Sequence, residues 1–252
     1  MTKPETITTE LTNLATTELT KRFGGVTAVD GATVEFRHGL VNALIGPNGS
    51  GKTTFFNCVT GMIAPDSGTV TYRGKDITGR SANKIAGAGI GRSFQLCRTF
   101  PQMTVLENML VGVSGPLPSM IRSWRSKDAV ERARALLHRV GIDHLEHAEA
   151  RNISYGQQKL LELAGVLMSD PETIMLDEPA GGVNPALIER IMTLIVELNN
   201  EGKTFLIVEH NMDLVMSLSH HVVVFDRGRP IATGSPKVVQ SDPRVLEAYL
   251  GI

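Results

Sequence analysis

The sequence predicts an α/β fold, in which an antiparallel sheet packs beside a parallel one and a helical subdomain is inserted in the α/β core. Three observations predict it. Apolar residues alternate from about residue 15 to 37, and a short apolar run at 40–45 precedes a glycine-rich loop. From about 101 to 170 the strand signals fade and apolar residues recur at helical spacing.

Residues 1–13 are expected to form a loose, flexible tail, because their many threonines give little to bury. Beyond the tail, Gly24-Gly25 and Asp30-Gly31 break the alternating segment into antiparallel strands, and 69–72 forms another short strand. We expect residues 14–252 to be a single domain. Its core and antiparallel subdomain take residues 14–100 and 171–252, and its helical subdomain takes about 101–170.

Parallel character returns after the helical segment. The apolar runs at 174–176 and 204–208 each have the composition of a buried strand, and residues 187–198 between them carry apolar side chains at helical spacing. Strand, helix and strand in this order form the unit of a parallel sheet.

The composition is that of an ordinary globular protein of 252 residues, 42% hydrophobic and 20% charged. Lys and Arg number 25 against 26 Asp and Glu, so no basic surplus points to nucleic acid or to an anionic lipid surface. The two cysteines, Cys58 and Cys97, fit free thiols in a reducing compartment. No run approaches the roughly 20 apolar residues that span a bilayer. We therefore expect a cytoplasmic chain unless a partner holds it at a membrane.

A glycine-rich loop follows the apolar run at 40–45. It reads Gly46-Pro47-Asn48-Gly49-Ser50-Gly51-Lys52-Thr53-Thr54 and matches the phosphate-binding pattern G-x-x-x-x-G-K-[ST]. Such a pattern arises by chance in about one in a hundred chains, but here a buried strand precedes it and a helix follows it. An ordinary glycine turn would need neither Lys52 nor Thr53. The loop therefore predicts a site for the phosphates of a nucleotide.

Two acids, Asp177 and Glu178, follow the apolar strand at 174–176. At the carboxyl end of a parallel strand they would face the ligand crevice. There Asp177 is suited to hold Mg²⁺ together with the Thr53 hydroxyl, and Glu178 is suited to position and deprotonate an attacking water. Taken alone, the pair is more simply explained as solvated acids that open a turn. The phosphate loop in the same core favours the functional interpretation.

Two further polar residues carry weaker signals. His210 follows the apolar strand at 204–208 by two residues, at a carboxyl end from which it could reach the γ-phosphate. A single histidine is more often a surface or core residue, however. Gln95 is equally weak by itself.

The segment Ser154-Tyr155-Gly156-Gln157 begins an amphipathic helix. Ser154, with Gln157 three residues later, has the spacing of a capping box. The same helix start presents unpaired N–H groups that can bind an anion. We therefore expect a helix cap here that can also serve as an anion-binding end.

The order of these motifs resembles the ATP-binding-cassette ATPases over about residues 15–252. The resemblance implies a P-loop NTPase (RecA-like) core that binds ATP with Mg²⁺ and hydrolyses the ATP. It also implies roles for single residues: Gly46 to Thr54 hold ATP, Phe23 stacks on adenine, Thr53, Gln95 and Asp177 arrange Mg²⁺, and Glu178 and His210 are catalytic. For Phe23 the alternative is packing in the core.

By the same resemblance, a second subunit caps the bound ATP through Ser154, Tyr155, Gly156, Gln157 and Asn184. Tyr155 stands where most cassettes have glycine, and Asn184 stands where aspartate is commoner. Asn184-Pro185 is also typical of a helix start. Both departures resemble the ATP-binding subunit of bacterial branched-chain amino-acid importers. Further likenesses to that subgroup are Arg22-Phe23-Gly24-Gly25, Asn57-Cys58-Val59-Thr60-Gly61 and Ala248-Tyr249-Leu250-Gly251.

This resemblance implies an ATPase subunit that powers uptake of branched-chain amino acids through a membrane permease. The implied partners are a second ATPase subunit, identical or paralogous, the permease subunits and, indirectly, a periplasmic solute-binding protein. No nucleic acid is among them. The chain would be cytoplasmic and peripheral on the inner face of the membrane.

Several alternatives stay open. Cassettes for urea, another amino acid or lipopolysaccharide export share part of the pattern. A cassette that clamps nucleic acid or ribosomes is a different class, and a small-molecule P-loop kinase is a third. The kinase gives no role to Ser154 or His210.

Overall fold

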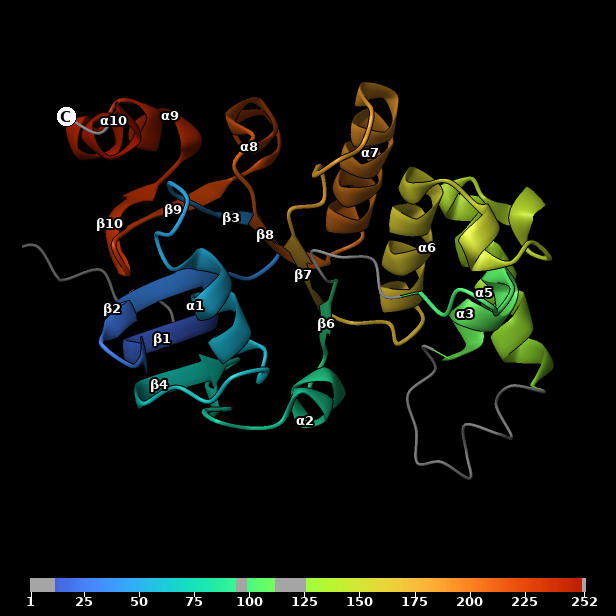
Figure 1. The fold of residues 1–252 in the computed structure, drawn as a ribbon, viewed down its shortest axis with the longest axis horizontal. Coiled ribbons are helices and arrows are strands. Elements are labelled where there is room, and N and C mark those ends of the chain that lie inside the picture. Colours follow the sequence, from blue (N-terminus) through green and yellow to red (C-terminus); the bar gives the residue numbers. More distant parts are fainter. Residues whose placement is uncertain (1–11, 94–98, 112–125, 251–252) are drawn as a thin grey trace, which may run out of the picture. The chain divides into compact units, whose positions relative to one another are not determined.

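A computed structural model describes residues 12–93, 99–111 and 126–250. The chain forms two compact units (Figure 1). The terminal unit contains residues 1–85 and 215–252, and the middle unit contains residues 86–214. The short helices α2 (Ala82–Gly87) and α8 (Met212–Leu218) lie where the chain passes from one unit to the other. The expected division into a core, a β subdomain and a helical subdomain stays a prediction.

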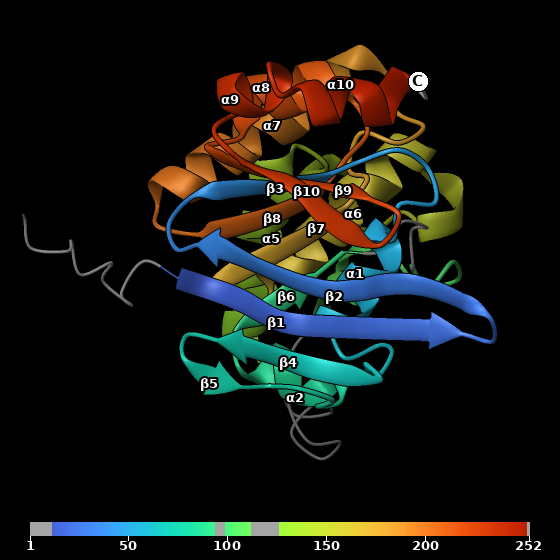
Figure 2. The ribbon, with the colours of Figure 1, turned by 90° about the vertical axis from the view of Figure 1, so that its left-hand side faces the viewer.

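An antiparallel sheet of the terminal unit has the strand order β2-β1-β4-β5. Figure 2 shows the long strands β1 and β2 side by side, with β4 along the other edge of β1. The bounds are β1 Thr12–Phe23, β2 Val26–Arg37, β4 Ser67–Tyr72 and β5 Lys75–Asp76. The sequence prediction of antiparallel strands is thereby confirmed.

Two details of that prediction were wrong. Asp30-Gly31 does not interrupt a strand, because β2 runs through both residues and Gly31 adopts a left-handed φ of 62° within it. The expected tail of 1–13 is too long, because β1 begins at Thr12 and Asn13 is buried.

Three more strands of the terminal unit form the order β10-β9-β3, in which β3 is parallel to β9 and β10 is antiparallel to it. The bounds are β3 Val41–Ile45, β9 His221–Asp226 and β10 Arg229–Gly234, with helices α1 Lys52–Val59, α9 Pro236–Gln240 and α10 Pro243–Leu250. The β9–β10 hairpin and the two C-terminal helices were not predicted.

Aromatic rings join the two sheets of the terminal unit to α1. Phe55 of α1 packs edge-to-face on Phe36 of β2 and on Phe225 of β9, with ring centroids 6.1 Å and 5.1 Å apart. All three side chains are fully buried. Each such ring pair adds roughly 0.5–1.5 kcal/mol beyond area burial. The start of α1 is therefore held rigidly in the core.

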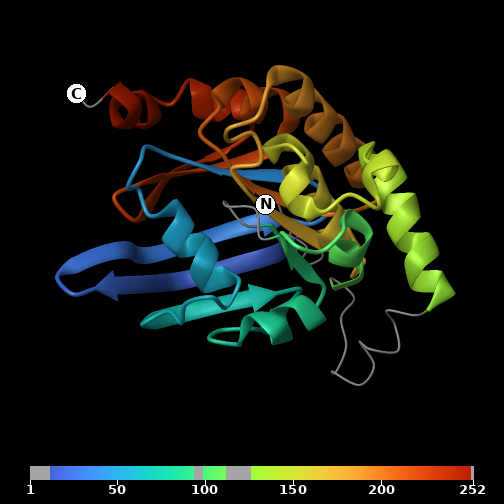
Figure 3. The ribbon, with the colours of Figure 1, turned by 45° about the vertical axis from the view of Figure 1, so that its right-hand side comes forward.

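The middle unit contains the parallel strands β8-β7-β6 and four α-helices of the described residues, drawn from green to orange in Figure 3. Every residue of β7 and β8 is buried, as expected of parallel strands covered on both faces. The strands are β6 Ile90–Arg92, β7 Thr173–Asp177 and β8 Thr204–Val208. The helices are α3 Val105–Val111, α5 Lys127–Val140, α6 Tyr155–Leu167 and α7 Pro185–Asn200, with 3₁₀ turns at Asp143–Leu145 and Ala150–Asn152.

The α/β class predicted from the sequence is confirmed, with an antiparallel sheet and a mainly parallel sheet in one chain. Among the residues that the structure describes, no helix has both the length and the apolar character needed to cross a bilayer.

Candidate functional site

The glycine-rich loop turns tightly around a buried lysine. Lys52 is the first residue of α1 and is only 7% exposed. Its ammonium donates hydrogen bonds to the carbonyl oxygens of Gly46 at 2.8 Å and Pro47 at 3.0 Å. These charge-assisted bonds compensate the burial of the ammonium and hold the loop closed over it.

Two glycines are required by close backbone approach. A Cβ on Gly46 would stand 2.1 Å from the carbonyl oxygen of Phe225, and a Cβ on Gly51 would stand 2.2 Å from that of Ala28. Both residues also have positive φ, 151° and 98°. Any side chain at either position would have to displace β9 or β2, so the loop shape depends on glycine there.

A cavity of about 270 Å³ opens over this loop and over the start of β2. Thr53 lines it and is exposed, so its hydroxyl is accessible to a bound ion. The Ser50 hydroxyl is buried and has no hydrogen-bond partner among the described residues. The lining residues are Val26, Thr27, Ala28, Gly49, Ser50, Gly51, Lys52, Thr53, Thr54 and Arg227. The cavity thus combines backbone N–H groups, hydroxyls and cations, which suits phosphate.

Phe23 lies at the end of β1, opposite Val26 across the β1–β2 turn. It does not line the cavity, although Val26 does. Its side chain is 49% exposed, so the alternative of packing in the core is wrong. The ammonium of Lys21 lies 5.6 Å from the ring centroid. The ring therefore has much of its surface in solvent, next to a strand residue that lines the cavity.

Arg227 is a lining residue that the sequence analysis missed. It is the first central residue of the β9–β10 turn and has a left-handed φ of 45°. The next residue, Gly228, donates from its amide to the Ser50 carbonyl at 2.9 Å and accepts from the Asp30 amide at 2.9 Å. Arg229 pairs with the Asp30 carboxylate at 2.7 Å. The turn that carries Arg227 is thus bonded to the loop and to β2.

The carboxylate of Asp177 ends β7 in a buried position, 2% exposed. Arg92 of β6 places a guanidinium nitrogen 3.5 Å from its Oδ2. The Asp177 amide donates to the Ser93 hydroxyl at 3.4 Å. A buried carboxylate beside one guanidinium is the kind of group that can bind a cation.

Glu178 follows in a strained conformation, with φ of 49°. Its amide donates to the Val208 carbonyl at the end of β8 at 2.9 Å, and its own carbonyl accepts from Gly181 at 3.0 Å. Left-handed φ at a non-glycine residue costs of order 1–3 kcal/mol and clusters at functional sites. The Nδ1 atom of His210 lies 3.7 Å from Glu178 Oε1. The structure therefore brings the two predicted catalytic residues together.

Glu209 is a second residue that the sequence analysis missed. Its side chain is fully buried, and its Oε1 accepts from the Ala180 amide at 2.9 Å. Its Oε2 accepts from the amides of His210 at 3.0 Å and Asn211 at 3.2 Å. One buried carboxylate thus ties the turn after β7 to the turn after β8. An acid directly after an apolar strand and directly before His210 was the available signal.

The predicted capping box is confirmed at the start of α6. The Ser154 hydroxyl accepts from the Gln157 amide at 3.3 Å, and the Gln157 side chain accepts from the Ser154 amide at 2.9 Å. Ser154 is exposed. The helix end therefore has a stable cap and faces solvent.

Tyr155 and Asn184, the two residues that depart from the common cassette pattern, lie in the same part of the middle unit. A Cβ built on Gly182 would stand 3.2 Å from Cε1 of Tyr155, and one on Gly156 would stand 2.5 Å from Leu187. Asn184 caps α7 by accepting from the Leu187 amide at 2.9 Å. The tyrosine ring thus stands against the segment that ends in Asn184.

The predicted site residues fall into two groups, one in each unit. Phe23 and the loop up to Thr54 belong to the terminal unit, and Asp177, Glu178, His210 and the two helix starts belong to the middle unit. Gln95 lies outside the described residues. A magnesium site shared by Thr53, Gln95 and Asp177 stays a prediction.

Comparison with known proteins agrees with the geometry. The family model described as ABC transporter matches residues 29–181. A second model, described as Branched-chain amino acid ATP-binding cassette transporter, matches residues 229–252, which include β10, α9 and α10.

Curated relatives match over almost the whole chain. The high-affinity branched-chain amino acid transport ATP-binding protein LivG of Escherichia coli is 42% identical over 94% of this chain and 97% of its own length. The corresponding BraF of Pseudomonas aeruginosa is 41% identical over 92% of this chain and 95% of its own. The solved structure of a nucleotide-free ATP-binding cassette from an ABC transporter aligns with a TM-score of 0.86 at 38% identity, covering 96% of this chain and 100% of that one. The chain therefore belongs to the ABC transporter family, as an ATP-hydrolysing cassette subunit.

Proposed function

We propose that this chain powers the uptake of branched-chain amino acids through a membrane permease. The observation that carries the proposal is the 42% identity to LivG over 94% of the chain. The separate match of residues 229–252 to the branched-chain amino acid cassette model supports it. Those relatives are named for branched-chain amino acid transport, and we extend that function to this chain.

The loop cavity supports the binding of ATP. Lys52 and the backbone N–H groups of residues 46–54 hold the β- and γ-phosphates, and the unpartnered Ser50 hydroxyl faces the same loop. Phe23 stacks on the adenine from the β1–β2 turn. The exposed Thr53 hydroxyl and the buried Asp177 carboxylate are oxygen donors of the kind that Mg²⁺ prefers. Together with Gln95 they hold the ion, which neutralises charge on the phosphates when it is bound.

Glu178 positions the attacking water and accepts its proton, and His210 contacts the γ-phosphate. Their 3.7 Å separation allows the histidine to orient the carboxylate. Glu209 is a positioning residue, because its carboxylate accepts from backbone amides that follow Glu178 and include that of His210. The hydrolytic carboxylate is thereby held on two rigid strand ends.

We further propose that a second ATPase subunit, identical or paralogous, completes the site. In this arrangement the exposed helix start at Ser154, Tyr155, Gly156 and Gln157, with the neighbouring Asn184, caps ATP held by the partner's loop. The permease subunits hold both ATPases on the inner face of the membrane, and a periplasmic solute-binding protein acts through the permease.

The test is reconstitution in proteoliposomes with the permease found by pull-down from membranes. ATP hydrolysis is measured with solute-binding protein loaded with L-leucine, and urea and a basic amino acid are the comparison solutes. We expect L-leucine to stimulate hydrolysis and to be transported. Stimulation of hydrolysis by urea alone would contradict this function. So would salt-sensitive binding of the chain to DNA or ribosomes in place of a permease.

A further inference from the structure

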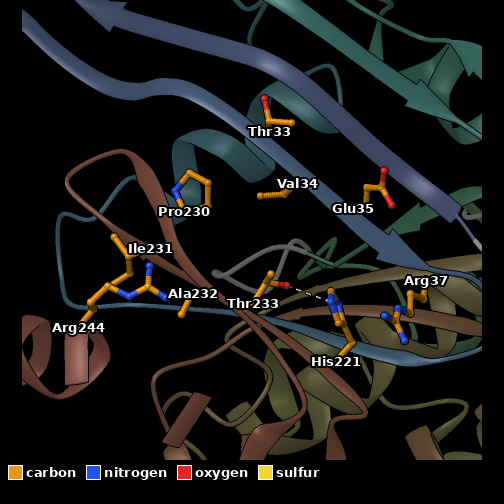
Figure 4. A pocket seen from close by; sticks show the side chains of 10 residues that line it. All are labelled: Thr33, Val34, Glu35, Arg37, His221, Pro230, Ile231, Ala232, Thr233 and Arg244. Atoms are coloured by element: carbon orange, nitrogen blue, oxygen red, sulfur yellow. Dashed lines mark hydrogen bonds between the residues drawn. The ribbon is translucent and has the colours of Figure 1, made fainter. Parts of the chain in front are cut away.

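The terminal unit contains a second cavity, of about 560 Å³, which shares no lining residue with the loop cavity. It lies between β2 and β10, each the edge strand of its sheet, and is closed by His221 of β9 and by α10 (Figure 4). Its volume lies within the range of small-molecule sites, roughly 300–1,000 Å³. Nothing in the ATPase mechanism uses it.

One end of this cavity is polar. Figure 4 shows Glu35 and Arg37 of β2 near the imidazole of His221. His221 is 8% exposed, and its Nε2 lies 3.1 Å from the Thr233 hydroxyl. Its Nδ1 is buried without a hydrogen-bond partner among the described residues. A buried polar atom of this kind is costly unless something bonds to it.

Burial lowers the pKa of His221, and the positive charge of Arg37 lowers it further while Glu35 opposes both. The imidazole is therefore neutral at pH 7, and both charged side chains lie within electrostatic reach of it. A neutral imidazole can accept or donate one hydrogen bond at Nδ1.

Glu35 and Arg37 are two residues apart on one strand, so their side chains leave the same face of β2. Neither forms an ion pair with another described residue. The buried Asn42 holds the Arg37 backbone on both sides, accepting from its amide at 2.8 Å and donating to its carbonyl at 2.9 Å. The Thr12 hydroxyl donates to Glu35 Oε2 at 3.3 Å. The cavity thus has one cation, Arg37, and one anion, Glu35, on a strand whose backbone is held in place by hydrogen bonds.

The other end of the cavity is apolar. Pro230 and Ile231 line it, and Figure 4 shows Arg244 beside Ile231. The guanidinium of Arg244 is already matched by Asp242, with Nη2 to Oδ2 at 2.7 Å. Its charge is therefore compensated, and the cavity offers a ligand one uncompensated charge of each sign.

We propose that this cavity binds a small aliphatic α-amino acid. The carboxylate of the ligand pairs with Arg37, its ammonium pairs with Glu35, and its side chain lies against Pro230 and Ile231. His221 bounds the polar end of the cavity with a neutral ring, so it adds no positive charge against the ammonium of the ligand. A phosphate or a simple carboxylate suits the cavity less well, because the Glu35 carboxylate repels it.

The first test measures binding of L-leucine to the purified full chain without nucleotide, by titration calorimetry. We expect saturable binding that weakens at least about tenfold in 4-methylpentanoate, which lacks the ammonium, and in 3-methylbutylamine, which lacks the carboxylate. Equal binding of L-leucine and 4-methylpentanoate overturns the proposal, as does stronger binding of inorganic phosphate or the absence of saturable L-leucine binding.

The second test uses Glu35→Gln and Arg37→Met, with Glu247→Gln and Arg73→Met as matched exposed controls outside the cavity. We expect the first pair to lose at least about tenfold in L-leucine affinity and the controls to lose none. ATP binding, measured on the same samples, should be unchanged in all four, which shows that each variant is folded. Wild-type affinity for L-leucine in Glu35→Gln contradicts the proposal.

This inference goes beyond the transport function and does not depend on it. ATP hydrolysis in the reconstituted transporter without binding of L-leucine in calorimetry would contradict only the amino-acid site. Binding of L-leucine without coupling to a permease would contradict only the proposed transport function.

Discussion

The amide of Gly228 donates a 2.9 Å hydrogen bond to the carbonyl of Ser50, and this bond fixes the β9–β10 turn to the phosphate loop. Its effect is to set Arg227 at the edge of the loop cavity. The β4–β5 turn has the same pair of residues, Arg73-Gly74, both also at positive φ. Arg73 does not line that cavity, so the chain contains its own matched control.

We predict that Arg227→Ala weakens ATP binding about fivefold, because an exposed guanidinium contributes up to about 1 kcal/mol to a phosphate contact. Arg73→Ala should leave the affinity unchanged. Equilibrium titration with a fluorescent ATP analogue at two salt concentrations measures both. Equal affinities for the two variants would mean that Arg227 only lines the cavity.

For Glu178→Gln we expect ATP affinity close to that of the wild type and a loss of hydrolysis of about 10²- to 10⁴-fold, the range for a positioned base. Single-turnover hydrolysis in the assembled transporter is the measurement, because it separates chemistry from product release. Hydrolysis at the wild-type rate in this variant would mean that another residue positions the attacking water.

Ser154→Arg should leave ATP binding by Lys52 nearly intact and abolish ATP-driven pairing of the subunits together with turnover. The reason is that a long cation replaces a small hydroxyl on an exposed helix start, while the residues of the phosphate loop are unchanged. Size-exclusion chromatography with ATP, run beside the hydrolysis assay, reports both effects. Unchanged turnover in the transporter would show that each loop works alone.

Replacing Glu209 by Gln removes a buried acceptor that serves three backbone amides. An amide side chain puts an NH₂ donor against at least one of them, so we expect a loss of about 1–3 kcal/mol in the free energy of unfolding. Urea denaturation measures it, with exposed Glu189→Gln as the control. If both variants unfold at the same urea concentration, the hydrogen bonds from the Glu209 carboxylate to the two turns contribute nothing to the free energy of unfolding.

His221 makes stability depend on pH. Its pKa in the folded chain lies below the ordinary value of 6.5 because burial disfavours the charged form. The unfolded chain therefore binds the proton first, and stability present above about pH 6.5 is lost as the pH falls toward the folded pKa. Thermal melts between pH 7.5 and 5 should show a smaller loss for His221→Gln than for the wild type. Parallel pH profiles for the two proteins would contradict this.

Local motifs were enough to predict the phosphate loop, the capping box and the acids after β7, because each depends on a short run of residues. The contacts of Arg227 and Glu209 could not be predicted from local sequence patterns. Arg227 reaches the loop only because a hairpin almost 180 positions away folds against Ser50. Glu209 was hidden for a different reason, since a buried acid differs from a solvated one only in its surroundings.

The same limit applies to the C-terminal hairpin. Residues 221–226 form a buried strand parallel to β3, and the two strands lie far apart in sequence. Strand pairing over such a separation leaves no local trace. The second cavity, which depends on β2 and β10 facing each other, was therefore invisible as well.

The bonds from the Lys52 ammonium to its own loop bear on how quickly nucleotide can bind. A loop that collapses without its ligand must be rebuilt at each cycle, and that search slows association. Here the Lys52 ammonium is bonded to two carbonyl oxygens of the loop itself, so contacts within the protein hold the loop in its shape. The loop therefore loses its conformational freedom during folding, and ATP binding carries little further entropy cost for ordering it.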